Sequence, residues 1–482
     1  MQDEKKELPH FVGRQTEIHQ LQRLVQSKKS SLAVIYGRRR IGKSSLIREA
    51  FKDQFVLYFE GVENQSKSRQ ITHFLSQLSY QVKNAHPQFS VKNWSDVFLQ
   101  LVPIISSHQS VVIVLDEFQW MANYRSELVS ELKMIWDQYF TQKGKVILIL
   151  CGSIASFMIS KVIRSSSFYG RIQLMIHLKE FFLSESSQML NQLGVEEILE
   201  SHLLLGGVPL YLELLNDRLK QDSSVRLGIQ NLAFLPNSYF VEEYERVFVS
   251  HFGKNLNFKK IISTLALHPY GLSREELSRF TKITLGGNFS QELFNLESAG
   301  FISSVRPYDK GEKSKFVKYY LSDAYLRFYF SFIEPNFKKI KSGAKDIFLQ
   351  LTQKAVYASW LGISFEYLCA YHASKISEKL GFSGIGYTVG SYFQSYKKGT
   401  GIGGQIDLLF DREDNVLTLC ELKYTNNPVG IDVISEVEKK IEILPLKKKK
   451  TLQKILITKS PPSTDLLKKA YFYKILRATD LL

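Results

Sequence analysis

A glycine-rich segment carries the clearest chemical pattern of the sequence. It reads Gly37-Arg-Arg-Arg-Ile-Gly42-Lys43-Ser44 and fits G-x-x-x-x-G-K-[ST]. Glycines let backbone N–H groups close around phosphate oxygens, the Lys43 ammonium neutralises their charge, and the Ser44 hydroxyl can ligate Mg²⁺. For the three arginines of the segment, exposed loop charge is an equally open interpretation. The predicted nucleotide contacts are Gly37, Arg38, Arg39, Arg40, Ile41, Gly42, Lys43, Ser44 and Ser45.

Two acidic residues follow an apolar run farther along the chain. Residues 111–115 are Val-Val-Ile-Val-Leu, and Asp116 and Glu117 come directly after them. A phosphate site needs one carboxylate at the end of a neighbouring strand to position Mg²⁺ and a second group to polarise the attacking water. We expect Asp116 to hold the metal, directly or through water, and Glu117 to act on the water. Without the phosphate loop, a helix N-cap would be the favoured interpretation.

Two further polar positions complete the expected site. A third apolar run, residues 146–150, ends at Cys151-Gly152-Ser153, which places the Ser153 hydroxyl where it can sense the terminal phosphate. Tyr169-Gly170-Arg171 offers a guanidinium that could stabilise transition-state charge, on its own subunit's nucleotide or on a neighbour's. A surface salt bridge is an equally weighted role for Arg171.

A second charged constellation lies near the C-terminus. Glu421 and Lys423 stand two apart in a strand and so share one face, and Asp407 lies on the preceding strand of the same hairpin. Two carboxylates can hold Mg²⁺ and a lysine can activate water, which are the parts of metal-assisted phosphodiester hydrolysis. Glu366, on an upstream helix, is a further candidate metal ligand. Each of these residues taken alone would be ordinary surface charge.

The elements that must position these residues indicate an α/β fold. From about residue 10 to 160, continuous β-branched runs alternate with helical segments, as in a parallel sheet with crossover helices. Three helices and two short strands then predict a winged helix, and a helix, a hairpin, a helix and a last strand predict a third α/β domain. The expected domains are residues 1–250, 255–335 and 350–482.

The composition of the chain indicates which kind of partner it binds and in which cellular compartment it works. The 482 residues fit about three domains, and 63 Lys and Arg against 47 Asp and Glu leave a net charge of +16, which favours a polyanion. No apolar run approaches the ~18 residues of a membrane span, and three scattered cysteines fit a reducing compartment. We therefore expect a cytoplasmic protein with DNA as partner and no membrane association.

The sequence of the predicted winged helix does not decide between DNA contact and packing against other domains. Its recognition helix, residues 288–299, carries Glu292 and Glu297 and no Lys or Arg, which is poor chemistry for phosphate contact. Its wing is richer in lysine, with Lys310, Lys313, Lys315 and Lys318. DNA contact by the wing and a purely inter-domain packing role are both open interpretations.

Several motifs together give the sequence a family resemblance. They are Phe11-Val-Gly13-Arg14 with Glu17, the phosphate loop, Leu-Asp-Glu-Phe-Gln, Cys-Gly-Ser, Tyr-Gly-Arg and Gly206-Gly-Val-Pro-Leu-Tyr211. With them the chain resembles the prokaryotic AAA-type ATPases often called archaeal ATPases, within the STAND-related group. The resemblance implies a P-loop sheet with a helical lid that binds ATP. It also implies base-side or lid contacts at Val12, Gly13 and Pro209.

The C-terminal arrangement D-(x13)-E-x-K resembles the PD-(D/E)xK nuclease fold, which such ATPases commonly carry at this end. Ile406 stands where the motif has proline, a common variation. The preferred hypothesis is an ATP-hydrolysing protein that couples nucleotide state to a DNA-acting, restriction-endonuclease-like domain. The alternative is a STAND-type nucleotide switch whose last domain only binds DNA or a protein, and a homo-oligomer fits either hypothesis.

Overall fold

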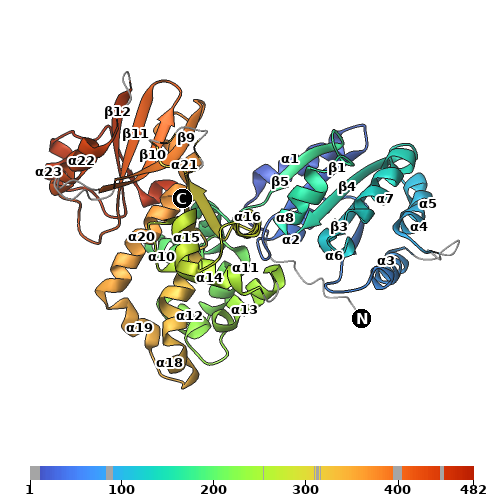
Figure 1. Cartoon of the computed structure of the whole chain (residues 1–482), viewed down its shortest axis with the longest axis horizontal. Coiled ribbons are helices and arrows are strands. Elements are labelled where there is room, and N and C mark those ends of the chain that lie inside the picture. The colour runs from blue at the N-terminus through green and yellow to red at the C-terminus, as the bar shows by residue number, and fades with distance from the viewer. Residues whose placement is uncertain are drawn as a thin grey trace. The chain divides into compact units, whose positions relative to one another are not determined.

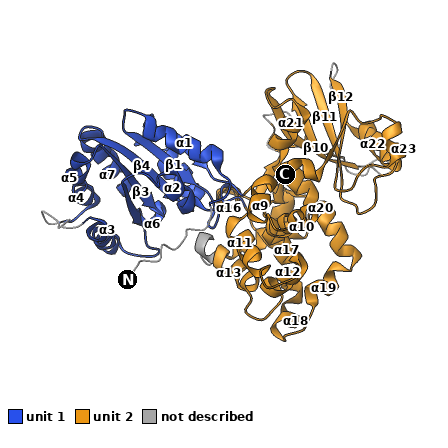
Figure 2. Cartoon of the chain, turned by 180° about the vertical axis from the view of Figure 1, so that it is seen from behind, with its two compact units in different colours: residues 1–180, 298–300 blue, residues 181–297, 301–482 orange. Residues whose placement is uncertain are grey.

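The computed structural model describes residues 11–82, 91–252, 255–308, 310, 314, 316–394, 404–445 and 450–482. The chain divides into two compact units, Met1–Glu180 with Ser298–Gly300, and Phe181–Glu297 with Phe301–Leu482 (Figure 2). The three-domain partition expected from the sequence is a different division and stays a prediction. Within the described ranges, no helix is both long enough and apolar enough to cross a membrane.

The first unit contains a five-stranded parallel sheet in the order β2-β3-β4-β1-β5 (Figure 1). Because β1 lies between β4 and β5 rather than beside β2, its carboxyl end is a point where the strand order reverses, and ligands of open α/β sheets bind at such points. The glycine-rich loop begins here. The strands are β1 (Ser31–Tyr36), β2 (Val56–Glu60), β3 (Ser110–Asp116), β4 (Lys145–Gly152) and β5 (Ile172–His177).

Helices cover both faces of this sheet, which explains why its strands are continuous apolar runs. Along β1 the side chains alternate: Leu32 and Val34 belong to one buried cluster, and Ala33 and Ile35 belong to the other. Helices α1 (Gln15–Gln26) and α2 (Lys43–Ala50) pack on the second face. The first face is covered by α3 (Lys67–Gln81), α4 (Trp94–Leu99), α5 (Val102–Ser107) and α7 (Glu127–Ile135).

Glutamine side chains of α3 occupy the open backbone groups of the edge strand β2. The Gln81 amide accepts from the Tyr58 N–H (2.7 Å) and donates to the Tyr58 carbonyl (2.8 Å). One turn earlier, Gln77 makes the same pair of bonds with Glu60, at 2.8 and 3.1 Å. Each amide thus replaces a missing strand neighbour, which blocks edge-to-edge pairing with another chain.

The second unit begins with a helical region. It leads into a small antiparallel sheet of order β6-β8-β7, formed by β6 (Leu272–Ser273), β7 (Ile302–Val305) and β8 (Lys318–Leu321). Ser273 and Glu276 form a capping box at the start of α15. The helices are α9 (Leu183–Met189), α10 (Val195–Leu205), α11 (Pro209–Arg218), α12 (Val225–Ala233), α13 (Tyr239–Phe252), α14 (Leu256–Ala266), α15 (Arg274–Thr281), α16 (Gly287–Ser298), α17 (Ala324–Phe328), α18 (Phe337–Lys341) and α19 (Ile347–Thr352).

A second five-stranded sheet, of order β13-β12-β11-β10-β9, ends the chain. Strands β9, β10 and β11 are antiparallel neighbours, whereas β11, β12 and β13 run parallel. Helix α22 (Asp432–Ile443) is the crossover from β11 to β12. The remaining elements are α20 (Ala355–Tyr371), α21 (Ala373–Leu380), β9 (Tyr387–Gln394), β10 (Gly404–Arg412), β11 (Val416–Lys423), β12 (Thr451–Thr458), α23 (Thr464–Lys468) and β13 (Lys474–Arg477).

A buried histidine joins the helical region to α20 and α21. His372 Nε2 accepts a hydrogen bond from the Leu183 N–H (2.8 Å), and its Nδ1 lies 2.9 Å from the Leu368 carbonyl. Only the neutral ring with its proton on Nδ1 makes both bonds. Burial lowers the pKa of His372 to about 4.

We expect the second unit to lose stability as the pH falls below 6.5. Between about pH 6.5 and 4 the unfolded chain binds a proton at His372 that the folded chain does not, at a cost of up to about 3 kcal/mol. Denaturant unfolding at pH 7.5, 6 and 5 measures the slope. His372→Gln should reduce this slope without removing it, because burial also lowers the pKa of His202. The matched change His268→Gln, at a half-buried histidine two residues after α14, is the control. Equal slopes in the wild type and His372→Gln would contradict the assignment.

Candidate functional site

The glycine-rich loop joins β1 to α2, the strand and helix context that the sequence predicts. Gly37 has φ 152°, and a side chain there would place its Cβ 2.3 Å from the Leu178 carbonyl oxygen. Gly42 has φ 82° and caps α2. Both positions therefore require glycine, because L side chains rarely adopt these φ values. Arg40 also has a positive φ, 73°.

Lys43 is buried at the centre of the loop. Its Nζ donates to the carbonyls of Gly37 (3.0 Å) and Arg38 (2.9 Å), and its side chain is 6% exposed. The ammonium is thus held at the helix N-terminus, where unpaired N–H groups also attract anions. This arrangement fits a nucleotide phosphate.

Of the remaining residues of the glycine-rich loop, two arginines contact neighbouring side chains. Arg38 is buried and pairs with Glu180 at 2.9 Å. Arg39 lies 3.4 Å from Glu63 and covers the Trp120 ring. These two arginines thus tie the loop to neighbouring segments, and their predicted phosphate contacts stay predictions. Ile41 is buried, and Ser45 is exposed on α2.

Asp116 ends β3 beside the loop and is 4% exposed. Its Oδ2 accepts the hydroxyls of Ser44 (2.7 Å) and Tyr58, and its Oδ1 accepts the Glu117 N–H (2.8 Å). Burial raises the pKa of Asp116, but these hydrogen bonds outweigh burial and hold the pKa below its usual range. The residue is therefore an anion next to Ser44, and carboxylate and hydroxyl oxygens are ligands that Mg²⁺ accepts.

Glu117 is held by two neighbours at the end of the sheet. Its Oε2 accepts from the Ser153 hydroxyl (2.6 Å) and from the Gln119 amide (2.5 Å). Gln119 also donates to the Ser153 Oγ at 3.2 Å. The predicted pair Glu117 and Ser153 is thus brought together, with Gln119 as a third, fully buried member.

Arg171 does not join this site. It precedes β5, and the parallel register pairs Leu32 with Ile172 at the amino ends of β1 and β5. The phosphate loop follows the carboxyl end of β1, about 20 Å away at ~3.3 Å per residue. Arg171 instead forms a two-bond ion pair with Asp137, at 2.8 and 2.9 Å. This geometry favours the salt-bridge role that the sequence left equally open, and action of Arg171 on a nucleotide stays a prediction.

The residues expected to contact the adenine base or to form the lid, Val12, Gly13 and Pro209, belong to the two different compact units. Val12 is half-buried and Gly13 is buried at the start of the described chain. The next residue, Arg14, donates to the Lys179 carbonyl (2.6 Å) and the Ile41 carbonyl (3.5 Å), which ties this segment to the phosphate loop. Pro209 is the first residue of α11 in the second unit, and its role at the base stays a prediction.

The C-terminal charges converge on one face of the second sheet. The register pairs Leu408 with Cys420, which sets Asp407 opposite Glu421. Lys423 lies 3.3 Å from Glu421 and also contacts Glu436 of α22. Burial, followed by the charges of Asp407 and Glu421, raises the pKa of Glu366 to about 8, which shows that Glu366 senses the same cluster.

A second lysine occupies the centre of this cluster. Lys440 Nζ of α22 lies 2.7 Å from Glu421 and 3.9 Å from Asp407. Burial raises the pKa of Asp407, and Lys440 opposes that shift. Over the described part of the chain, no group of three or more His, Cys, Asp or Glu side chains is arranged to hold a metal. The expected ligands Glu366, Asp407 and Glu421 are neighbours, but a divalent ion would have to displace Lys440.

The sequence analysis assigns no role to four residues of these sites. Arg14 and Gln119 stand in the motifs that carry the family resemblance, so their place in the chain pointed to the site, but their contacts did not follow from it. Tyr58 has no local signal, because its partner lies on another strand. Lys440 sits four residues after Glu436 on one helix face, a spacing that only the fold relates to β11.

Residues 11–215 match the family model described as "ATPase domain predominantly from Archaea". An uncharacterized protein of Methanocaldococcus jannaschii is 27% identical over 368 residues, which cover 74% of this chain and 75% of that protein. The Walker-type ATPase of Pyrococcus abyssi has a similar structure, with a TM-score of 0.51 and 18% identity over 67% of this chain and 96% of its own.

The ORC2 protein of Aeropyrum pernix, in ADPNP–ADP complexes, gives a TM-score of 0.46 at 15% identity over 73% of this chain and 98% of its own. The family match spans the phosphate loop and the Asp116–Glu117 pair, and the Pyrococcus structure supports the same fold. The chain therefore contains an ATPase domain of the archaeal type, built on the parallel sheet of a P-loop ATPase.

Proposed function

We propose that the protein hydrolyses ATP with Mg²⁺ and couples its nucleotide state to a DNA-acting, nuclease-like C-terminal domain. The observation that carries the ATPase half is the hydrogen bond between Ser44 and the ionised Asp116 beside the buried Lys43. A hydroxyl, a carboxylate and an ammonium in this order suit a metal-bound triphosphate. Mg²⁺, when bound, neutralises phosphate charge.

The chain's own residues supply the rest of the reaction. The loop N–H groups and Lys43 bind and orient the phosphates. Glu117 is the group that orients and polarises water, and its carboxylate is held by Ser153 and Gln119. Ser153 would also contact the terminal phosphate of bound ATP. When its hydroxyl turns from Glu117 to that phosphate, the Glu117 carboxylate loses one hydrogen bond and can accept one from water. ATP binding is thereby linked to the activation of water by Glu117.

The order α14-β6-α15-α16-β7-β8 with sheet order β6-β8-β7 supports a winged helix. Its contacts favour a packing role over DNA contact. The wing's Tyr308 N–H donates to the Ser391 carbonyl of β9 (2.9 Å), and Lys318 covers the Phe393 ring at 3.9 Å. Lys313 and Lys315 lie outside the described residues.

The recognition helix of this module is less acidic at its surface than the sequence implies. Glu292 is buried and accepts from Asn257 at 2.9 Å, and Glu297 accepts the Ser304 N–H at 2.9 Å. The exposed positions on α16 include Asn288 and Gln291, which carry no charge. Neutral side chains do not neutralise phosphates, so this face also favours a packing role.

The C-terminal sheet supports a nuclease-like fold through its helix–hairpin–helix–strand order and the facing Asp407, Glu421 and Lys423. One observation favours the second candidate, a STAND-type switch whose last domain only binds DNA or a protein. The Lys440 ammonium already balances the carboxylates that a cleaving metal would need.

We expect Glu117→Gln to lower the ATP turnover number at least about 100-fold while ATP binding persists, because the glutamine amide cannot polarise water. Lys43→Ala should abolish binding, because it removes the buried phosphate counter-charge. Phosphate release and equilibrium binding measure the two effects. Glu127→Gln, at an exposed glutamate paired with Lys67, is the matched control. Wild-type turnover in Glu117→Gln would rule out the assigned role.

The nuclease-like half is tested by plasmid nicking. If the domain cleaves, the full-length protein should nick supercoiled DNA with Mg²⁺, and Asp407→Asn should remove nicking, because it takes away one of the two facing carboxylates. Asp465→Asn, at an exposed aspartate on α23, is the matched control. No cleavage above the Asp407→Asn background would support the binding-only alternative.

A further inference from the structure

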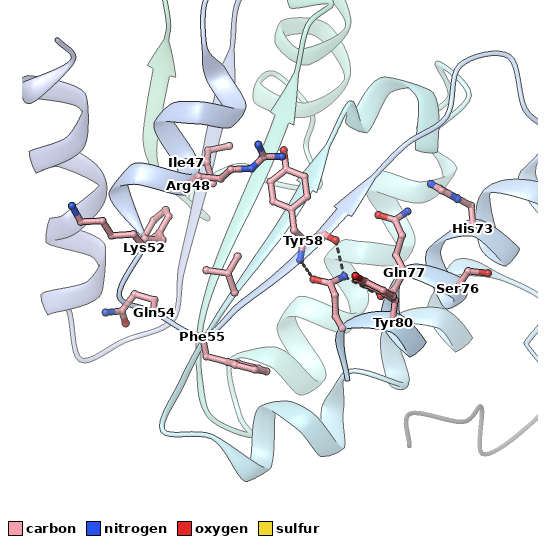
Figure 3. Close-up of a pocket in the computed structure, with 13 residues that line it drawn as sticks. Ile47, Arg48, Lys52, Gln54, Phe55, Tyr58, His73, Ser76, Gln77 and Tyr80 are labelled. Atoms are coloured by element: carbon pink, nitrogen blue, oxygen red, sulfur yellow. Dashed lines mark hydrogen bonds between the residues drawn. The ribbon is translucent and has the colours of Figure 1, made fainter. Parts of the chain in front are cut away.

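An open groove of about 870 Å³ lies between α2 and α3, with β2 as its floor (Figure 3). Arg48 of α2 and Lys52, in the turn that follows α2, line one wall, and His73 and Tyr80 of α3 line the other. Tyr58 lies on the floor, and its hydroxyl leaves the groove toward Asp116. The groove therefore meets the nucleotide site at this one side chain.

Tyr58 is held from both walls. Gln81 of α3 closes a pair of hydrogen bonds on its backbone, at 2.7 and 2.8 Å. The Arg48 guanidinium lies 5.4 Å from the centre of its ring. Arg48 and Ser44 are four residues apart and so share one face of α2. Tyr58 is therefore linked to both residues of this helical turn. Its ring lies against Arg48, and its hydroxyl donates to the same Asp116 Oδ2 atom as the Ser44 hydroxyl.

The strand register explains how the hydroxyl reaches Asp116. Tyr58 pairs with Val114, and Asp116 lies two residues farther along β3, on the same face. A tyrosine is long enough to reach this diagonal neighbour. Two hydroxyls on Oδ2 and the Glu117 N–H on Oδ1 then restrain this carboxylate, and the Cys151 thiol is a further donor to it.

We propose that Tyr58 is a positioning residue for the ATPase, whose hydroxyl fixes the Asp116 carboxylate in the orientation that serves Mg²⁺. The inference rests on the proposed ATP hydrolysis. Tyr58 acts through Asp116 and touches no reacting atom. Its loss should weaken the contribution of Mg²⁺ to nucleotide binding and leave metal-free nucleotide binding intact.

Tyr58→Phe in the full-length protein tests this. Binding of a fluorescent ATP analogue is measured in EDTA and across a Mg²⁺ titration, together with kcat and KM. The Kd of the analogue in EDTA should stay within twofold of the wild-type value. The Mg²⁺ concentration that gives half of the increase in analogue binding should rise about tenfold, because the free energy of one hydrogen bond to a charged group corresponds to about that factor. Tyr80→Phe, at a 92% exposed tyrosine in the same groove, is the control and should change neither.

Arg48→Met is a second variant, which keeps the Tyr58 hydroxyl but removes the guanidinium that lies over the Tyr58 ring. It should shift the Mg²⁺ midpoint in the same direction, by about threefold. An unchanged midpoint in Tyr58→Phe, or equal weakening with and without Mg²⁺, would overturn the inference while leaving ATP hydrolysis standing. Absence of Mg²⁺-dependent binding in the wild type would overturn the proposed function itself.

Discussion

The buried charge of Asp116 is the constraint on which the ATPase unit depends. β3 is apolar from Val111 to Leu115, and an unpaired carboxylate in such surroundings would cost several kcal/mol. The compensating donors come from α2, from β2, from the Cys151 thiol of β4 and from the backbone of Glu117. The left-handed φ of Glu117, 47°, accompanies the N–H contact to Oδ1. The two strands and the helix must therefore stand in register for the charge to be tolerated.

Sequence reasoning located this site where its chemistry is local. The phosphate loop, the Asp116–Glu117 pair and the hairpin of β10 and β11 follow from motifs whose residues are close in the chain. Tyr58 and Lys440 could not be found in this way, because each meets its partner across separate elements. Arg171 shows the opposite case: its motif leaves a transition-state role and a surface salt bridge equally open, and only strand direction shows that it lies at the amino end of the sheet, where it pairs with Asp137.

The two carboxylate clusters differ in what balances their charge. Around Asp116 the donors are hydroxyls, a thiol and a backbone N–H, which orient the carboxylate without cancelling its charge. Around Asp407 and Glu421 the balance comes from the ammonium groups of Lys440 and Lys423. The carboxylate of Asp116 thus keeps its negative charge without a cationic side chain bonded to it, whereas the second cluster already contains two cations from the chain.

This difference bears on how the C-terminal domain can act. Lys440 is carried by α22, the crossover between the parallel strands β11 and β12, so the backbone of that helix is held by the sheet on both sides. Only the side chain can retract, and Glu436, one turn earlier on the same helix, already engages Lys423 rather than offering Lys440 an alternative partner. Metal-assisted cleavage at Asp407 and Glu421 must therefore begin with the loss of an ion pair at 2.7 Å, whereas simple binding of DNA or protein needs no such step.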